Sequence, residues 1–138
     1  YSMYSFMEHC KQYDEYNGSV AVVVCDINHL SDINIQYGQK AGNQALINVA
    51  GVLKKILMDR AYIARINECN FVAVMKNVTD AEAGKTFEQI KRVVEKECNN
   101  GKFGVTIEYG IAMRKASNRW IMDIVHEAVN NMRDRKGR

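Results

Sequence analysis

Two loops of this sequence carry the side chains best suited to chemistry. Asp26 directly follows Val20–Cys25, a short, continuously apolar and β-branched run that predicts a strand covered on both faces. A second group of candidates follows a later apolar run and comprises Asn67, Glu68, Cys69, Asn70 and Phe71. Loops at strand ends are where binding and catalytic residues gather. The two groups are therefore the first candidates for a shared site.

Each group also has a purely structural interpretation. Asp26 could be a helix cap or a turn residue, and the stretch Asn67 to Asn70 could be a tolerant turn. The Cys69 thiol could bind a soft metal or undergo redox chemistry, but no His or Cys stands near it at a metal-ligand spacing. We therefore interpret Cys69 as a small side chain, and we leave both interpretations of Asp26 open.

The composition indicates one compact domain in a reducing compartment. The chain has 138 residues, of which 47% are hydrophobic and 25% charged, enough to bury one core. Its net charge of +3 is spread thinly and predicts no nucleic-acid partner. Cys10, Cys25 and Cys98 fall on core-like positions without a CxxC pair, which is typical of reduced thiols. We expect a cytoplasmic domain with no membrane insertion of its own, because the longest apolar run is too short to cross a bilayer.

The hydrophobic pattern predicts alternating helices and strands. Helical periodicity extends from Met3 to Asn17-Gly18, and a second amphipathic helix follows a polar stretch and ends near Asp59. The pattern predicts five further elements after that helix. Two strands over 62–66 and 71–75 form an antiparallel hairpin, a helix capped by Thr79 or Asp80 ends at Asn100-Gly101, and a strand over 103–113 and a helix over 121–132 follow. This order predicts an α/β fold with helices on both sides of a central mixed sheet.

Three motifs resemble the GGDEF family of diguanylate cyclases. The segment 25–46 resembles the family signature DxDxFKxxNDxxGHxxGDxxL and matches it at Asp26, Asn34, Tyr37, Gly38, Gly42 and Leu46. The segment 64–75 aligns with the family's aRxGGDEFavl, and Val105–Ala112 is similar to its strand VTISIGIA. The resemblance covers nearly the whole chain, so residues 1–138 are identified as a single degenerate GGDEF domain with a sheet of about five strands. Because the chain lacks an initiator Met, we expect it to be part of a longer multidomain signalling protein.

The resemblance implies a site for two nucleotides and a divalent metal, and here that site is altered. Family members join two GTP molecules into cyclic di-GMP, with Mg²⁺ held by Asp26 and the Ile27 carbonyl in this numbering. The family's second metal-binding acid falls on Cys69, which is a poor ligand for a hard ion. The two motif glycines are replaced by Asn67 and Glu68, so side chains now occupy the phosphate approach. The resemblance therefore implies no catalytic residue, and Mg²⁺ only if a nucleotide is bound.

Other positions implied by the resemblance concern the nucleotide itself. Asn34 and Asn43 fall where the family recognises guanine, and Arg133 falls where a lysine contacts phosphate. An amide at 43 does not match the guanine edge as a carboxylate does, although amides suit adenine. The family's product-inhibition motif falls on Met58 to Ala61 and does not fit.

These changes favour a catalytically inactive, regulatory domain in cyclic di-GMP-related signalling. Its expected partners are neighbouring domains of its own chain, a second copy in a homodimer, and GTP or another nucleotide. The alternative is an active or weakly active diguanylate cyclase, or a cyclase with an altered nucleotide preference.

Overall fold

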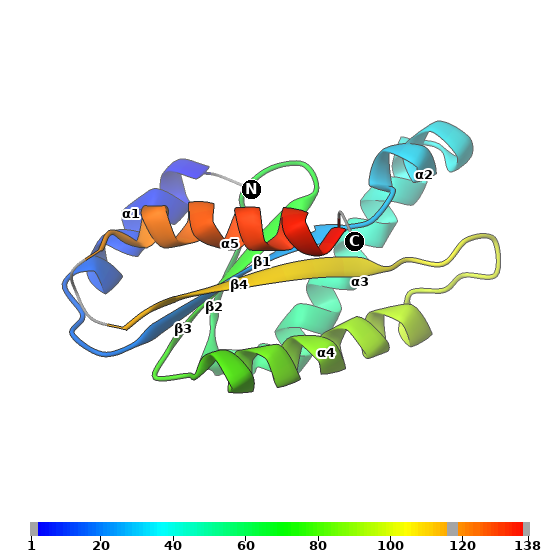
Figure 1. The fold of residues 1–138 in the computed structure, drawn as a ribbon. Helices are drawn as coiled ribbons and strands as arrows, with labels where there is room; N and C mark the ends of the chain where they lie inside the picture. Colours follow the sequence, from blue (N-terminus) through cyan, green and yellow to red (C-terminus); the bar gives the residue numbers. More distant parts are fainter. Residues whose placement is uncertain (1–2, 116–118, 137–138) are drawn as a thin grey trace.

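The computed structural model describes residues 3–115 and 119–136, which form one four-stranded sheet and the helices around it (Figure 1). The strands are β1 (Val20–Ile27), β2 (Tyr62–Arg65), β3 (Asn70–Lys76) and β4 (Ile107–Arg114). The α-helices are α1 (Met3–Asp14), α2 (Leu30–Tyr37), α3 (Gln39–Leu57), α4 (Asp80–Glu97) and α5 (Ile121–Lys136), and the short 3₁₀ helix η1 spans Met58–Arg60. The predicted α/β class is confirmed.

The sheet differs from the expected mixed sheet of about five strands. Its described strands number four, in the order β2-β3-β1-β4, and all neighbouring pairs are antiparallel. Each helical connection does join parallel strands, but another strand lies between them: β3 separates β1 from β2, and β1 separates β3 from β4. This split β-α-β arrangement removes every parallel pair. The expected strand from residue 103 is also shorter, because residues 103–106 lie outside β4.

Helices cover both faces of the sheet, which explains the continuous apolar run of β1. All eight residues of β1 are buried. Ala21, Val23 and Cys25 pack in the core toward α3 and α4, whereas Val20, Val22 and Val24 pack in the core toward α1 and α5. Figure 1 shows the two helix layers on opposite sides of the strands. The burial of Cys10, Cys25 and Cys98 agrees with their predicted core positions.

Local signals fix the ends of several helices. Thr79, one of the two predicted caps, accepts a hydrogen bond from the Glu82 amide, and the Glu82 carboxylate accepts one from the Thr79 amide. Helix α2, in the polar stretch, follows His29, whose φ of 59° lies in the left-handed region. Among the described residues, none of the helices combines the length and the hydropathy that a membrane span needs.

Helix α5 lies unusually close to β4, and the contact depends on Gly110. A methyl group at Gly110 would lie 2.3 Å from both the Ala128 carbonyl oxygen and the Met132 amide nitrogen. The absence of a side chain therefore allows α5 to pack on the edge strand and brings its last turn to the end of β1.

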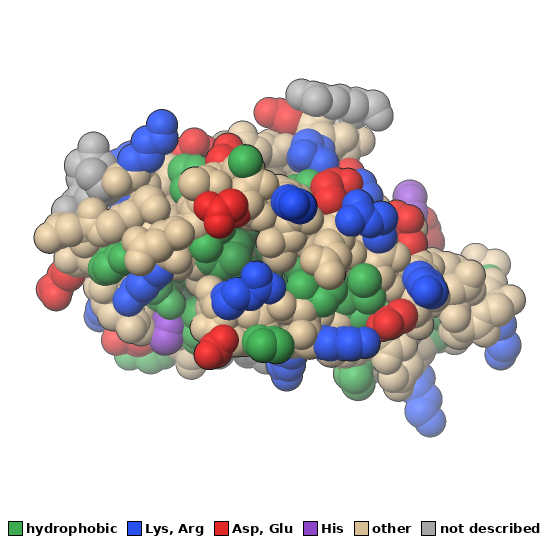
Figure 2. Space-filling view, turned by 90° about the horizontal axis from the view of Figure 1, so that it is seen from below, with side chains coloured by type: hydrophobic (Ala, Val, Ile, Leu, Met, Phe, Trp, Pro, Cys, Tyr) green, Lys and Arg blue, Asp and Glu red, His purple; other side chains and the backbone are tan. Residues whose placement is uncertain are grey.

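The molecular surface over α4 carries charges of both signs. Figure 2 shows Lys and Arg side chains interspersed with Asp and Glu over this face. On this face of the folded domain, as in the sequence, charges of one sign do not gather into a patch.

Candidate functional site

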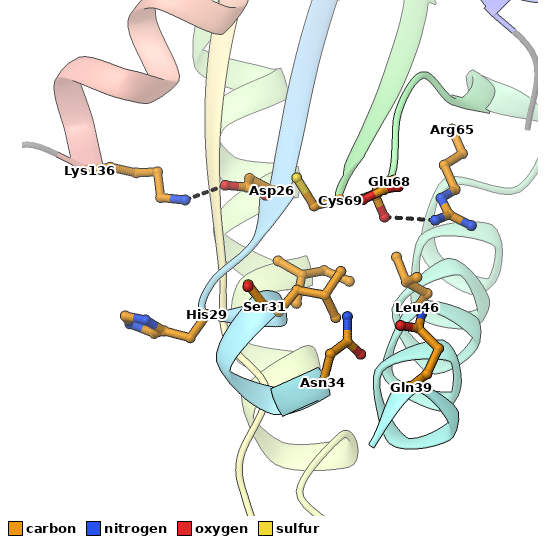
Figure 3. A pocket seen from close by; sticks show the side chains of 12 residues that line it. Asp26, His29, Ser31, Asn34, Gln39, Leu46, Arg65, Glu68, Cys69 and Lys136 are labelled. Carbon is orange, nitrogen blue, oxygen red and sulfur yellow. Dashed lines mark hydrogen bonds and ion pairs between the residues drawn. The ribbon is translucent and has the colours of Figure 1, made fainter. Parts of the chain in front are cut away.

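One cavity brings together the two loops that the sequence singles out. It has a volume of about 540 Å³ and lies between the end of β1, helices α2 and α3, the β2-β3 loop and the last turn of α5 (Figure 3). Its lining consists of Asp26, Ile27, His29, Leu30, Ser31, Asn34, Gln39, Leu46, Arg65, Glu68, Cys69 and Lys136. Its volume is that of a site for a small organic ligand.

Asp26 is the buried charge of this cavity. Strand β1 places it on the face covered by α5, and the residue is 9% exposed. Its Oδ2 accepts a hydrogen bond from the Lys136 ammonium, which forms an ion pair with it (Figure 3). Its Oδ1 is buried and has no hydrogen-bond partner among the described residues. A buried carboxylate requires a counter-charge, and here a side chain of the chain itself supplies it.

The β2-β3 loop is an ordered turn held by Asn67. The Asn67 Oδ1 accepts hydrogen bonds from the amides of Cys69 (3.0 Å) and Asn70 (2.8 Å), and its Nδ2 donates to Asn70 Oδ1. Arg65 donates to the carbonyl oxygens of Asn67 (3.0 Å) and Glu68 (2.7 Å). None of the four loop residues has a positive φ, so Asn67 shapes the turn through its side chain and not through a left-handed backbone.

Cys69 lies beside Asp26 and keeps its proton. Burial and then the neighbouring Asp26 carboxylate raise the pKa of the Cys69 thiol to about 11, although the positive charge of Lys136 opposes them. The thiol donates a hydrogen bond to Asn67 Oδ1 over 3.7 Å. The backbone carbonyl of Cys69 accepts a hydrogen bond from the Ile27 amide at 3.3 Å. The loop is thus tied to the end of β1, and the thiol that faces Asp26 is neutral at physiological pH.

Asn34 lines the opposite wall of the cavity. It packs directly on α3, where a methyl group at Gly42 would lie 1.6 Å from the Asn34 Oδ1. That oxygen is buried without a hydrogen-bond partner among the described residues. Gly42, which matches the family signature, therefore leaves room for Asn34.

The other two predicted nucleotide-binding residues do not line the cavity. Asn43 is exposed on α3, and its Oδ1 accepts a hydrogen bond from Gln39 at 3.2 Å. Arg133 is exposed on α5, and Lys136, one turn further along, reaches the cavity in its place. The nucleotide-binding roles of Asn43 and Arg133 therefore remain predictions. Lys136 and Arg65 are the cavity cations that the sequence interpretation missed.

The last turn of α5 is anchored beside the cavity by charged neighbours. Arg135 lies 3.1 Å from Glu108 and 3.6 Å from Glu88, and its guanidinium stacks on the Tyr109 ring. Burial raises the pKa of Glu108, but hydrogen bonds from Tyr109 and Arg135 and the charge of Lys91 outweigh it and lower the pKa overall. Glu108 thus stabilises the fold above its unfolded pKa, and this contribution is lost as the pH falls through the lowered folded pKa.

The donor set does not fit a magnesium site that depends on two carboxylates. At the expected position Asp26 is paired with Lys136, Cys69 is a protonated thiol, and Asn70 is an amide bound by Asn67. Within the described residues, no three His, Cys, Asp or Glu side chains are placed to hold a metal ion together. A divalent cation at Asp26 would have to displace an ammonium, and the neighbouring side chains offer it weak ligands.

Known proteins share both the sequence pattern and this architecture. The family model "Diguanylate cyclase, GGDEF domain" matches residues 3–138. Diguanylate cyclase A of Treponema denticola is 27% identical over 97 residues, which are 68% of this chain and 26% of that protein. Diguanylate cyclase DgcP of Pseudomonas aeruginosa is 33% identical over 81 residues, 59% of this chain and 12% of that protein. The matched part of the chain thus spans about a quarter or less of the length of these relatives.

Solved structures share the fold. The GGDEF domain of DgcB from Caulobacter crescentus, determined in complex with c-di-GMP, has a TM-score of 0.83 at 20% identity, with 96% of this chain and 80% of that chain covered. The diguanylate cyclase SiaD of Pseudomonas aeruginosa, determined with its activator SiaC, has a TM-score of 0.87 at 16% identity, with coverages of 97% and 54%. The sheet and its flanking helices are therefore those of a GGDEF domain. The chain belongs to the GGDEF domain family.

Proposed function

We propose that this chain is a catalytically inactive GGDEF domain that acts as a regulatory module in cyclic di-GMP-related signalling. The observation that carries the proposal is the ion pair between Asp26 and Lys136. In this ion pair Lys136 occupies the Asp26 carboxylate, which would otherwise hold the metal for phosphoryl transfer. That reaction depends on cations to neutralise the triphosphate.

The rest of the cavity supports the same proposal. Cys69 and Asn70 replace the two acids of the motif, and neither carries a negative charge at physiological pH. Glu68, which replaces a glycine, places a carboxylate on the cavity wall where a phosphate would approach. The metal position and the phosphate approach are therefore both unfavourable for GTP turnover.

The ordered cavity favours a retained binding role over a purely structural one. Its walls include two buried polar atoms, Asp26 Oδ1 and Asn34 Oδ1, that have no hydrogen-bond partner within the described part of the chain, and its volume suits a nucleotide. A ligand that binds only the folded domain would stabilise it and could change its contacts with neighbouring domains or with a second copy.

A turnover assay tests the proposal directly. The protein is incubated with GTP or with ATP, together with Mg²⁺ or Mn²⁺, and cyclic dinucleotide products are sought by mass spectrometry. We expect no product above that of the Asp26→Ala variant. Turnover by the wild-type chain that Asp26→Ala abolishes would overturn the proposal and establish an active cyclase.

A further inference from the structure

We infer that the Lys136 ammonium takes the place of a divalent cation in this cavity, so that the cavity binds a nucleoside monophosphate without metal. The inference deepens the proposed function and rests on it, because it concerns the ligand of the same cavity. It begins from the mismatch between the donor set around Asp26 and a magnesium site.

The first observation is where Lys136 lies. Its ammonium contacts Oδ2 of Asp26, the side chain through which a cation would be held. Asp26 is nearly buried, so removing its counter-charge would leave a carboxylate in a poorly solvated place. A covalently attached ammonium meets this need at every concentration of metal. A free divalent ion would have to compete with it and would be repelled by it.

The second observation is the unused capacity of Lys136. An ammonium has three N–H donors, and one of them serves Asp26. The side chain is 35% exposed and lines the cavity, so its other donors can reach a phosphate oxygen there. An ammonium between a carboxylate and a phosphate attracts both anions and reduces their mutual repulsion, as a bridging cation does.

The third observation is that the helix end that carries Lys136 is held in place before any ligand arrives. The adjacent residue, Arg135, is held by Glu108 at 3.1 Å and by Glu88 at 3.6 Å. Gly110 allows the same helix to lie against β4. The helix end therefore needs little further ordering when a ligand binds, which favours affinity.

The charges of the lining limit the number of phosphates. Lys136 and Arg65 are balanced by Asp26 and Glu68, so the cavity offers no excess of positive charge for a metal-free triphosphate. A monophosphate carries fewer negative charges than a triphosphate, so without metal it meets less repulsion from Asp26 and Glu68. Across the cavity stand neutral groups that suit a sugar and a base, the Ser31 hydroxyl and the amides of Asn34 and Gln39.

Isothermal titration with GMP, AMP and GTP, each in EDTA and in excess Mg²⁺, tests the inference. We expect a monophosphate to bind with the same Kd in both buffers and more tightly than GTP in EDTA. Lys136→Met should weaken this binding at least about tenfold, a loss of about 1.4 kcal/mol. Lys136→Arg should restore part of it. Lys54→Met, which removes an exposed lysine of α3, should leave it unchanged.

The other outcomes count against the inference in distinguishable ways. Binding that requires Mg²⁺, or that Arg133→Met weakens more than Lys136→Met does, overturns the role of Lys136 while leaving the domain a nucleotide-binding module. An absence of binding by every nucleotide in both buffers overturns the inference but not the lack of catalysis. Circular dichroism of each variant shows whether a loss of binding reflects a loss of the fold; if Lys136→Met is unfolded, Lys136→Arg and Arg133→Met decide between the two cations.

Discussion

Two buried charges on the same face of the sheet, Arg114 and Asp26, lie at opposite ends of the β1-β4 pair and differ in their surroundings. Arg114 is paired with Val20 in the β-ladder and is 1% exposed. Its guanidinium donates hydrogen bonds to two backbone carbonyl oxygens, those of Tyr16 (2.6 Å) and Arg119 (3.5 Å). Arg114 thus ties the loop that follows α1 to the end of β4 and to the residue that lies just before α5.

Asp26 instead has a side-chain partner, the Lys136 ammonium, which can move. An unpartnered atom does not distinguish the two charges, because Asp26 Oδ1 and Arg114 Nε are both buried without a hydrogen-bond partner among the described residues. The Lys136 side chain is 35% exposed, and the cavity opens beside it. Backbone partners identify Arg114 as a structural charge, because they cannot leave without unfolding. A side-chain partner and an adjoining cavity identify Asp26 as a charge whose environment a ligand can change. Burial alone does not separate the two roles, but the nature of the partners does.

Asp26 depends on α5 lying close to the sheet, because its partner Lys136 belongs to that helix, and Arg119, a partner of Arg114, lies just before it. The largest expected effect therefore comes from Gly110→Ala. The added methyl group would collide with backbone atoms of Ala128 and Met132, which cannot move without moving the helix. We expect a loss of about 3 kcal/mol in the free energy of unfolding, measured by urea denaturation.

The matched control for Gly110→Ala is Gly51→Ala, on α3, where the added methyl group has no described atom within 4 Å apart from its chain neighbours and the backbone of its own helix. It should stabilise the domain by about 0.5–1 kcal/mol, because alanine favours a helix over glycine. Equal changes in the free energy of unfolding for Gly110→Ala and Gly51→Ala would contradict the close packing of α5 on β4.

The structural role of Arg114 predicts the next largest effect. Arg114→Met keeps most of the buried volume but leaves the Tyr16 carbonyl without its donor, and we expect a loss of about 2–3 kcal/mol. Arg92→Met, at an exposed position of α4, should change stability by less than about 0.5 kcal/mol. Urea denaturation measures both. A loss near zero for Arg114→Met would mean that burial of this charge brings no stability.

Asp26→Asn should cost clearly less than Arg114→Met. The amide has the same shape and can still accept a hydrogen bond from Lys136, and the partly exposed ammonium can turn to water. Breaking a buried pair costs about 3–5 kcal/mol only when a charge is left without solvent or partner, so we expect about 1 kcal/mol here. If Asp26→Asn lowers the free energy of unfolding as much as Arg114→Met does in the same urea titration, Asp26 and Arg114 do not differ in their structural roles.

Most elements of this fold could be predicted from the sequence, because their hydrophobic period is clear. The run of β1 and the helical spacing in α3, α4 and α5 each indicate one kind of element. Helix α2 was not identified as a separate element, since its Asn and Asp residues obscure the period. The sheet could not be predicted as antiparallel, because which strand lies between two others depends on long-range packing and not on local pattern.

The cavity could be predicted only in part, for a related reason. Asp26, Ile27, Asn34, Glu68 and Cys69 do line it. Lys136 does not follow from the sequence, because the motif alignment indicates Arg133, three residues earlier on the same helix. Residues three apart lie on nearly the same face of a helix but about 4.5 Å apart along its axis. The contact between Lys136 and Asp26 joins two residues far apart in the sequence and depends on how α5 packs on the sheet, so the sequence of α5 alone does not predict it.

The smallest expected effect is a change in the reactivity of Cys69 when Asp26 loses its charge. Burial and the Asp26 carboxylate together hold the pKa of this thiol at about 11, so little thiolate exists at pH 8. In Asp26→Asn the burial remains but the carboxylate is gone. The pKa of Cys69 should therefore fall, and each unit of that fall raises the thiolate fraction about tenfold while the group is mostly protonated.

We expect iodoacetamide to label Cys69 several-fold faster in Asp26→Asn than in the wild type at pH 8, as followed by mass spectrometry of the tryptic peptides. The peptides with Cys10, Cys25 and Cys98 give an internal control, because these thiols are buried and become reactive only if the variant opens the fold. Faster labelling of all four would indicate loosening of the domain. Unchanged labelling of Cys69 alone would show that burial and not Asp26 controls its pKa, and would weaken the view that Asp26 is the electrostatic centre of the cavity.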